Sequence, residues 1–340
     1  MPTDLASPAL PLPPPSIRVG PDYRVFALFA ALNHYGYDLE GDPKMGDVRL
    51  AVRRHLAALP DPWREPERRW MECARPFWPR VGLMEKYALH QRDWPAGHPG
   101  PFGAGDQTAF RAWLAANVLE LPCEVPEDFL AALAGLGPML TGFAQRTGLA
   151  GLWHEHHAAH DDPGGLMDRA IGEGLGRSAS LLAVRSWPFS SVRVITNLLQ
   201  SRWLADLALI DSCLHAVVAA PDPSLAPSVV HEAVHLVVRP VLRKMWPQFE
   251  VWGRCAAGEA VRKRMEPQGY WGPTPAAGMY RAVQEALVRA ATIAAAAGPA
   301  EQLRARAETQ ALRGFALVPS LARFLASRAR SPLTAHELSG

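Results

Sequence analysis

The chain lacks the features that mark several common classes of protein. It has only four cysteines among 340 residues, Cys73, Cys123, Cys213 and Cys255, and they form no CxxC pair. We therefore expect free, buried thiols in a reducing compartment rather than a disulfide framework. The sequence also has no phosphate-binding loop, no GxGxxG fingerprint and no GxSxG elbow. Their absence argues against nucleotide binding through such loops and against a serine-hydrolase triad.

Charge of one sign and long apolar runs are also missing. The net charge is +2, with basic and acidic residues interspersed, so nothing directs the chain towards nucleic acid or an anionic membrane. The longest apolar candidate, Ala290 to Ala297, is far shorter than the roughly 18 to 20 residues that span a bilayer. We expect neither a nucleic-acid partner nor a membrane span.

The first residues do not resemble an export signal. Residues 1–16 contain six prolines and no basic start followed by an apolar core. This composition is typical of a Pro-rich tail and not of a signal peptide. A cytoplasmic location is the corresponding expectation.

The most informative pattern that is present is His231-Glu232-Ala-Val-His235, an HExxH motif. On a helix, residues four apart lie on one face, so both imidazoles can reach the same ion. Neutral imidazole suits Zn²⁺, and Glu232, about 100° round the helix, can reach a water on the metal without being a ligand.

The surroundings of the motif decide how much weight it carries, because HExxH also arises by chance. Apolar residues from Val229 to Leu242 point in every direction round this helix, which predicts that the helix is buried. Buried histidines and a buried glutamate are costly unless they are paired or bound to metal. The alternative is a partly exposed helix whose histidines are satisfied by hydrogen bonds.

The pattern along the chain predicts a helical first half and a small sheet just before the motif. Proline-rich breaks interrupt the first half at 60–66, 76–79 and 95–101. Short β-compatible runs occupy 181–185, 192–199 and 215–220, while 204–210 is ambiguous. Helical patterns occupy 23–35, 47–59, 108–119, 126–134, 135–159, 276–297, 300–317 and 320–329.

These patterns together predict an α+β fold that is mostly α. Strands, then a buried HExxH helix, then a separate helix with an acidic residue is the order of a zincin metallopeptidase. We expect a zincin-like fold with a helical N-terminal layer, a small sheet and a C-terminal helical lobe. The expected division is a Pro-rich disordered tail over 1–17, a helical region over 18–180, a catalytic region over 181–330 and a tail over 331–340.

The HExxH motif itself does not supply a third metal ligand. Catalytic zinc sites commonly use three protein ligands. The longer metzincin pattern needs Gly and His where this chain has Val238 and Val241, so that class is excluded. A glutamate remains, and the downstream candidates are Glu250, Glu259, Glu266 and Glu285.

Glu285 is the first choice, because it lies in a regular helical pattern. Glu259 is the second choice and Glu250 the third. On a helical wheel, however, Glu285 lies opposite the apolar stripe formed by Met279, Val283, Ala286, Leu287 and Ala290. Its alternative role is therefore a solvated partner of Arg289 at i+4. Spacing between separate helices leaves the choice open.

The stretch from about Val192 to Ala291 resembles an uncharacterised bacterial family of HExxH proteins, a domain-of-unknown-function family. The resemblance rests on His235-Leu-Val-Val-Arg-Pro240 and on Glu285-Ala-Leu-Val-Arg-Ala290. It implies a gluzincin-like zinc site with His231, His235 and Glu285 as ligands and Glu232 as general base. The chain departs from the family in having Arg239 where a small polar residue is expected.

Two further groups of residues could contribute chemistry. Tyr280, Tyr270 and His215 are candidates for stabilising an oxyanion near the metal, with Tyr280 preferred because it lies close before the candidate ligand. His156, His157 and His160 form a second histidine cluster. We interpret that cluster as a surface helix end, because no carboxylate or cysteine completes it on the same face.

The function that the sequence predicts is a zinc-dependent peptidase acting on a peptide or protein substrate, with Glu232 as general base and Tyr280 as a second catalytic residue. One alternative is a catalytically idle zincin fold that binds or regulates, with a structural zinc. A metal hydrolase that does not act on peptides is another.

Overall fold

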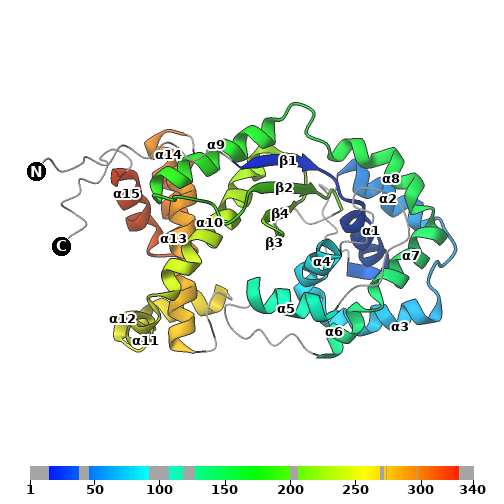
Figure 1. Cartoon of the computed structure of the whole chain (residues 1–340), viewed down its shortest axis with the longest axis horizontal. Coiled ribbons are helices and arrows are strands. Elements are labelled where there is room, and N and C mark those ends of the chain that lie inside the picture. The colour runs from blue at the N-terminus through cyan, green and yellow to red at the C-terminus, as the bar shows by residue number, and fades with distance from the viewer. Residues whose placement is uncertain are drawn as a thin grey trace, which may run out of the picture. The chain divides into compact units, whose positions relative to one another are not determined.

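The computed structural model describes residues 15–37, 46–91, 107–117, 127–199, 206–268, 272, 274–296 and 298–328. These residues form many helices and one small mixed sheet (Figure 1), which confirms the expected α+β class with mostly α structure. Residue contacts divide the fold into two compact units. The N-terminal unit comprises Ile17–Asp168 and Ser191–Leu225, and the C-terminal unit comprises the described residues up to Ser16, Arg169–Ser190 and the described residues from Ala226 onward.

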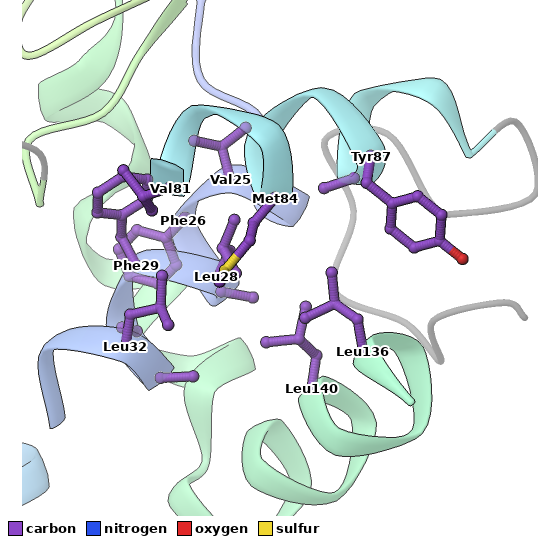
Figure 2. Packing of buried hydrophobic residues seen from close by; sticks show 14 of the residues in the cluster. Val25, Phe26, Leu28, Phe29, Leu32, Val81, Met84, Tyr87, Leu136 and Leu140 are labelled. Atoms are coloured by element: carbon purple, nitrogen blue, oxygen red, sulfur yellow. The ribbon is translucent and has the colours of Figure 1, made fainter. Parts of the chain in front are cut away.

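The N-terminal unit is a set of helices packed round one fully buried helix, α1. Every residue of α1 is buried, and Figure 2 shows side chains from α1, α4 and α7 meeting in this core. The helices are α1 (Tyr23–Leu32), α2 (Asp47–Ala57), α3 (Glu65–Ala74), α4 (Val81–His90), α5 (Gln107–Asn117), α6 (Glu127–Leu133), α7 (Leu136–Thr147) and α8 (Leu149–His156).

A buried cluster of charged side chains lies at the start of α1 and connects this helix to the sheet. The Asp22 carboxylate accepts a hydrogen bond from the backbone N–H of Arg24 at 2.9 Å, which caps the helix. The same carboxylate pairs with the guanidinium groups of Arg24 at 2.7 Å and Arg193 at 3.0 Å. Two cations round one buried carboxylate satisfy a charge that would otherwise oppose folding. Gly36, at φ 114°, then lets the chain turn after the helix.

The sheet also belongs to the N-terminal unit and has the order β1-β2-β4-β3. Its strands are β1 (Ser16–Gly20), β2 (Ser191–Thr196), β3 (Asp206–Ile210) and β4 (Cys213–Val218). β2 pairs with β4 in parallel, and β3 pairs with β4 antiparallel. Asp211 and Ser212 join β3 to β4 with positive φ at both positions, as a two-residue hairpin that follows the sheet twist requires.

The C-terminal unit consists of helices. They are α9 (Leu166–Leu181, which enters this unit at Arg169), α10 (Ala226–Arg243), α11 (Trp246–Trp252), α12 (Ala256–Met265), α13 (Pro275–Ala295), α14 (Ala300–Leu312) and α15 (Val318–Arg328). α13 contacts α10, α11, α12, α14 and α15 (Figure 1). The Thr274 hydroxyl caps α13 by accepting from the Ala277 N–H at 3.2 Å, and Pro275 occupies the first turn.

Several sequence-based expectations of local structure were wrong. The run 181–185 is not a strand: α9 extends to Leu181, and Ala183 has φ 51°, which no strand adopts. The proline-rich breaks at 60–66 and 76–79 were only partly right: α3 begins at Glu65 with Pro66 in its first turn, where proline is tolerated, and residues 76–79 lie in a 3₁₀ helix, Arg75–Arg80. The ambiguous run 204–210 forms a strand over its described part, β3.

The cysteine expectation was partly right. Cys73, Cys213 and Cys255 are free, but Cys73 and Cys255 are exposed and not buried. Cys123 and residues 1–14 and 331–340 lie outside the described part of the chain.

One helix among the described residues has the length and apolar composition of a membrane span. It covers Pro223–Arg243. Its apolar stretch of 18 residues has a mean hydropathy of 1.2, and 44% of that stretch is buried in the structure. Buried core helices have the same length and composition, so one such helix does not by itself indicate a span. The expected absence of a membrane span stays a prediction.

The packing of α9 against α10 generates a matched pair of substitutions. A Cβ at Gly174 would lie 2.7 Å from Cγ2 of Val230, a side chain with little rotamer freedom. Gly174→Ala should therefore lower the free energy of unfolding by about 1 to 3 kcal/mol. Nothing lies within 4 Å of a Cβ at Gly176 on the same helix. Gly176→Ala should stabilise by up to about 1 kcal/mol through helix propensity. Urea unfolding of both variants checks this, and equal effects would contradict the α9–α10 contact.

Candidate metal centre

α10 presents both motif histidines at positions where they can act together. His231 and His235 are one helical turn apart, with Nε2 atoms 3.2 Å from each other and ring planes at 78°. His235 is buried and His231 is half-buried. Apolar neighbours on α10, including Val230, Val234 and Val238, are buried and anchor the helix. The expectation of burial on all sides was too strong, because Val241 is 60% exposed.

Glu285 reaches the histidines from α13. Its side chain is buried, with only 8% of the residue exposed. The helical-wheel expectation of a solvated Glu285 was wrong, because α13 is enclosed by five other helices and has no wide solvent face. The expected pairing with Arg289 does occur, with Arg289 Nη2 2.6 Å from Glu285 Oε1. Glu285 therefore contacts both its helical neighbour and the histidines of α10.

The spacing of the three side chains is close to that round a small tetrahedral ion, with the two distances to Glu285 measured to different oxygens and single ligand atoms all within 4.8 Å of one another. His235 Nε2 lies 3.3 Å from Glu285 Oε2, and His231 Nε2 lies 3.6 Å from Oε1. Zinc bonds of about 2.0 to 2.2 Å in tetrahedral geometry place ligand atoms about 3.3 to 3.6 Å apart. Among the described residues, these three form the one group of His, Cys, Asp and Glu side chains whose ligand atoms converge in this way.

The same three groups can also be joined by hydrogen bonds, with different demands on the histidine protons. A single proton on His235 Nε2 would have to serve both His231 and Glu285, and the 3.6 Å separation of His231 from Glu285 exceeds a hydrogen bond. One observation favours the hydrogen-bonded state over the metal-bound state. His235 Nδ1 is buried and has no hydrogen-bond partner among the described residues, and the Nε2–H tautomer leaves no proton there. An ion contacts all three groups but places the proton of His235 on Nδ1.

Two of the three candidate ligands have the protonation state that a metal requires. Burial, with smaller contributions from His235 and Arg289, lowers the pKa of His231 to about 3 against the opposing effect of Glu285. Burial alone would raise the pKa of Glu285, but His235, His231 and Arg289 outweigh it and lower the pKa to about 2. His231 is therefore neutral and Glu285 ionised at neutral pH, as ligands of Zn²⁺ must be.

The other candidate third ligands lie elsewhere on the surface. Glu250 and Glu259 are exposed, on α11 and α12. Glu259 is bound by the Arg262 guanidinium at 2.6 and 2.8 Å, and Glu266 pairs with the same guanidinium at 2.6 Å. The structure brings only Glu285 of the four candidates to the histidines within the described residues.

The second catalytic candidates occupy different surroundings. Glu232 is half-buried on α10, next to the first ligand. Tyr280 is 2% exposed, and its ring packs on Trp246 and Phe249 of α11, with ring centroids 5.9 and 5.6 Å apart. Its role in oxyanion stabilisation stays a prediction. His215 lies on β4 in the N-terminal unit, and Tyr270 lies outside the described residues.

The second histidine cluster differs from the expected surface helix end at one residue. His160 is completely buried, with Nδ1 3.0 Å from the carbonyl oxygen of Thr196, and burial lowers its pKa to about 4. His156 and His157 are half-buried. Since α8 ends at His156 and a 3₁₀ turn follows, the helical spacing assumed for the cluster does not continue to His160.

Sequence reasoning did not single out Gln310 and Phe315, which contact Arg289, the partner of Glu285. Arg289 donates from Nη1 to Oε1 of Gln310 at 2.8 Å, and its Cζ lies 4.0 Å from the ring centroid of Phe315. Gln310 lies on α14, and Phe315 follows that helix. No local pattern connects these positions to Glu285, because the contact depends on how α14 returns to α13.

No protein-family model matches the chain, and neither a curated protein nor a solved structure is significantly similar to it. The resemblance to the HExxH family is therefore neither supported nor contradicted, and interpretation of the site rests on its geometry.

The ligand geometry predicts about one divalent ion per chain, with zinc preferred for a His₂Glu donor set. His231→Ala and His235→Ala should remove that ion, whereas His156→Ala should keep it, because His156 lies outside the converging group. Metal analysis after zinc loading and desalting measures this. Retention of the full zinc content by both motif variants would exclude the site.

The third ligand can be tested separately. Glu285→Ala should weaken zinc binding by more than the about 10- to 100-fold typical of residues that only support a ligand. Glu259→Ala and Glu250→Ala are matched controls, because both carboxylates are exposed and outside the cluster. Competition titration with a chelator gives the dissociation constants. If Glu259→Ala weakened zinc binding equally, the assignment of Glu285 as the third ligand would be wrong.

Proposed function

We propose that this protein is a zinc-dependent peptidase whose ligands are His231, His235 and Glu285. The observation that supports the proposal is the convergence of two imidazoles and one carboxylate at 3.2 to 3.6 Å, next to a glutamate at the second position of the motif. Three protein ligands leave a fourth tetrahedral position for water, which distinguishes catalytic zinc sites from closed structural ones.

When bound, zinc makes a coordinated water acidic near neutral pH and polarises a substrate carbonyl. The residues of the chain supply the rest. His231 and His235 hold their ring nitrogens at the centre, and Glu285 contributes the one negative charge. Glu232, about 100° round α10 from His231, would take the proton of the attacking water and return it to the leaving amine.

Glu232→Gln tests the general base directly. The amide is nearly isosteric with the carboxylate but cannot accept the water's proton, so hydrolysis should fall by about 10²- to 10⁴-fold while zinc stays bound. The measurement is cleavage of a broad peptide mixture followed by mass spectrometry, with zinc content determined on the same samples. Glu250→Gln, at an exposed carboxylate on α11, is the control and should keep wild-type activity.

Each outcome of this experiment selects one interpretation. Undiminished hydrolysis by Glu232→Gln would exclude Glu232 as the base. Loss of zinc in that variant would make Glu232 a support of the metal. A wild-type protein that holds zinc and cleaves no peptide would support the idle fold with a structural zinc, or a metal hydrolase with another substrate.

A further inference from the structure

Arg289 has an environment that an ordinary helical ion pair does not have. Its side chain is 21% exposed and that of Glu285 is 10% exposed, whereas the i,i+4 pair of Arg177 with Glu173 on α9 is 41% and 64% exposed. Exposed pairs of that kind contribute little and are easily broken by solvent and salt. The Arg289–Glu285 pair is shielded from both.

Residues from outside α13 hold the guanidinium of Arg289 in place. Gln310 accepts a hydrogen bond from Nη1 at 2.8 Å, and the Phe315 ring lies under the guanidinium with Cζ 4.0 Å from its centroid. Phe315 is itself 4% exposed. A planar group fixed by a hydrogen bond and by a ring face has little rotational freedom left. Arg289 therefore presents Nη2 to Glu285 in one fixed direction.

The two oxygens of Glu285 have different roles in this arrangement. Oε1 lies 2.6 Å from Arg289 Nη2, a charge-assisted contact, and 3.6 Å from His231 Nε2, while Oε2 lies 3.3 Å from His235 Nε2. An oxygen committed to a guanidinium is a poorer metal ligand than its free counterpart. The guanidinium therefore competes with a metal for Oε1, and Oε2, beside His235, is left as the principal ligand oxygen.

We propose that Arg289 is a positioning residue, which fixes Glu285 as a one-oxygen ligand of the metal and is itself held by Gln310 and Phe315. This inference rests on the proposed metal centre and adds the residues that orient its carboxylate. It also makes the geometry of the centre depend on Gln310 of α14 and on Phe315, which follows that helix. Neither residue contributes a ligand.

Chelator competition on three variants tests the proposal. Arg289→Ala should weaken zinc binding by about 10- to 100-fold, as loss of a group that orients a ligand does, and Arg289→Lys, which keeps the charge, should recover part of it. Gln310→Ala removes one support and leaves both Glu285 and Arg289 in place. It should also weaken binding, and it serves if Arg289→Ala does not fold.

X-ray absorption of the zinc-loaded proteins provides a second measurement. Wild type should show a single short carboxylate oxygen, and Arg289→Ala should gain the second oxygen or lose order at this ligand. Arg262→Ala is the control, because it removes an exposed pairing with Glu259 and Glu266 and should change neither measurement.

The outcomes separate this inference from the function proposed above. If wild type binds zinc and both Arg289→Ala and Gln310→Ala bind it equally well, the positioning role is wrong while the metal centre stands. If Arg289→Ala lowered the unfolding midpoint without zinc but left the zinc affinity of the folded protein unchanged, the role of Arg289 would be structural only. Failure of the wild type to bind zinc would overturn both proposals.

Discussion

The contact between α10 and α13 is the constraint on which the candidate site depends. The histidines lie on one of these helices and the glutamate on the other, so the ligand set exists only while the two are packed together. α10 and α13 pack against each other over many residues, and this packing brings the Glu285 carboxylate within 3.3 Å of His235 and 3.6 Å of His231 on the other helix.

The same contact creates an electrostatic problem that Arg289 solves. A carboxylate buried beside two imidazoles and apolar helices would be strongly destabilising without a partner. Arg289 balances that charge, so the pair is neutral before any ion arrives, and burial keeps His231 uncharged. An ion would then bring the full positive charge to a low-dielectric site, where its effect on a water is strongest.

Sequence patterns predicted the parts of this site that are local and missed the parts that depend on tertiary packing. The spacing of His231 and His235 follows from helical periodicity, and the structure places both rings together. The burial of Glu285 was not predictable, because a wheel of α13 cannot show that five helices surround it. The predicted proline break at 60–66 was only partly right, because Pro66 lies in the first turn of α3, where proline is tolerated.

All ligands and supports of the centre lie in the C-terminal unit, on α10, α13 and α14 and at the residue Phe315. An ion bound there would cross-link helices that are far apart in sequence, and any ligand that binds only the folded state stabilises it. Stabilisation by zinc would therefore accompany a catalytic centre as well as a structural one. The two differ in coordination: a structural centre needs a fourth protein ligand, and among the described residues only three side chains converge. For this reason an open fourth position, rather than any effect on stability, would be the physical sign of a catalytic centre.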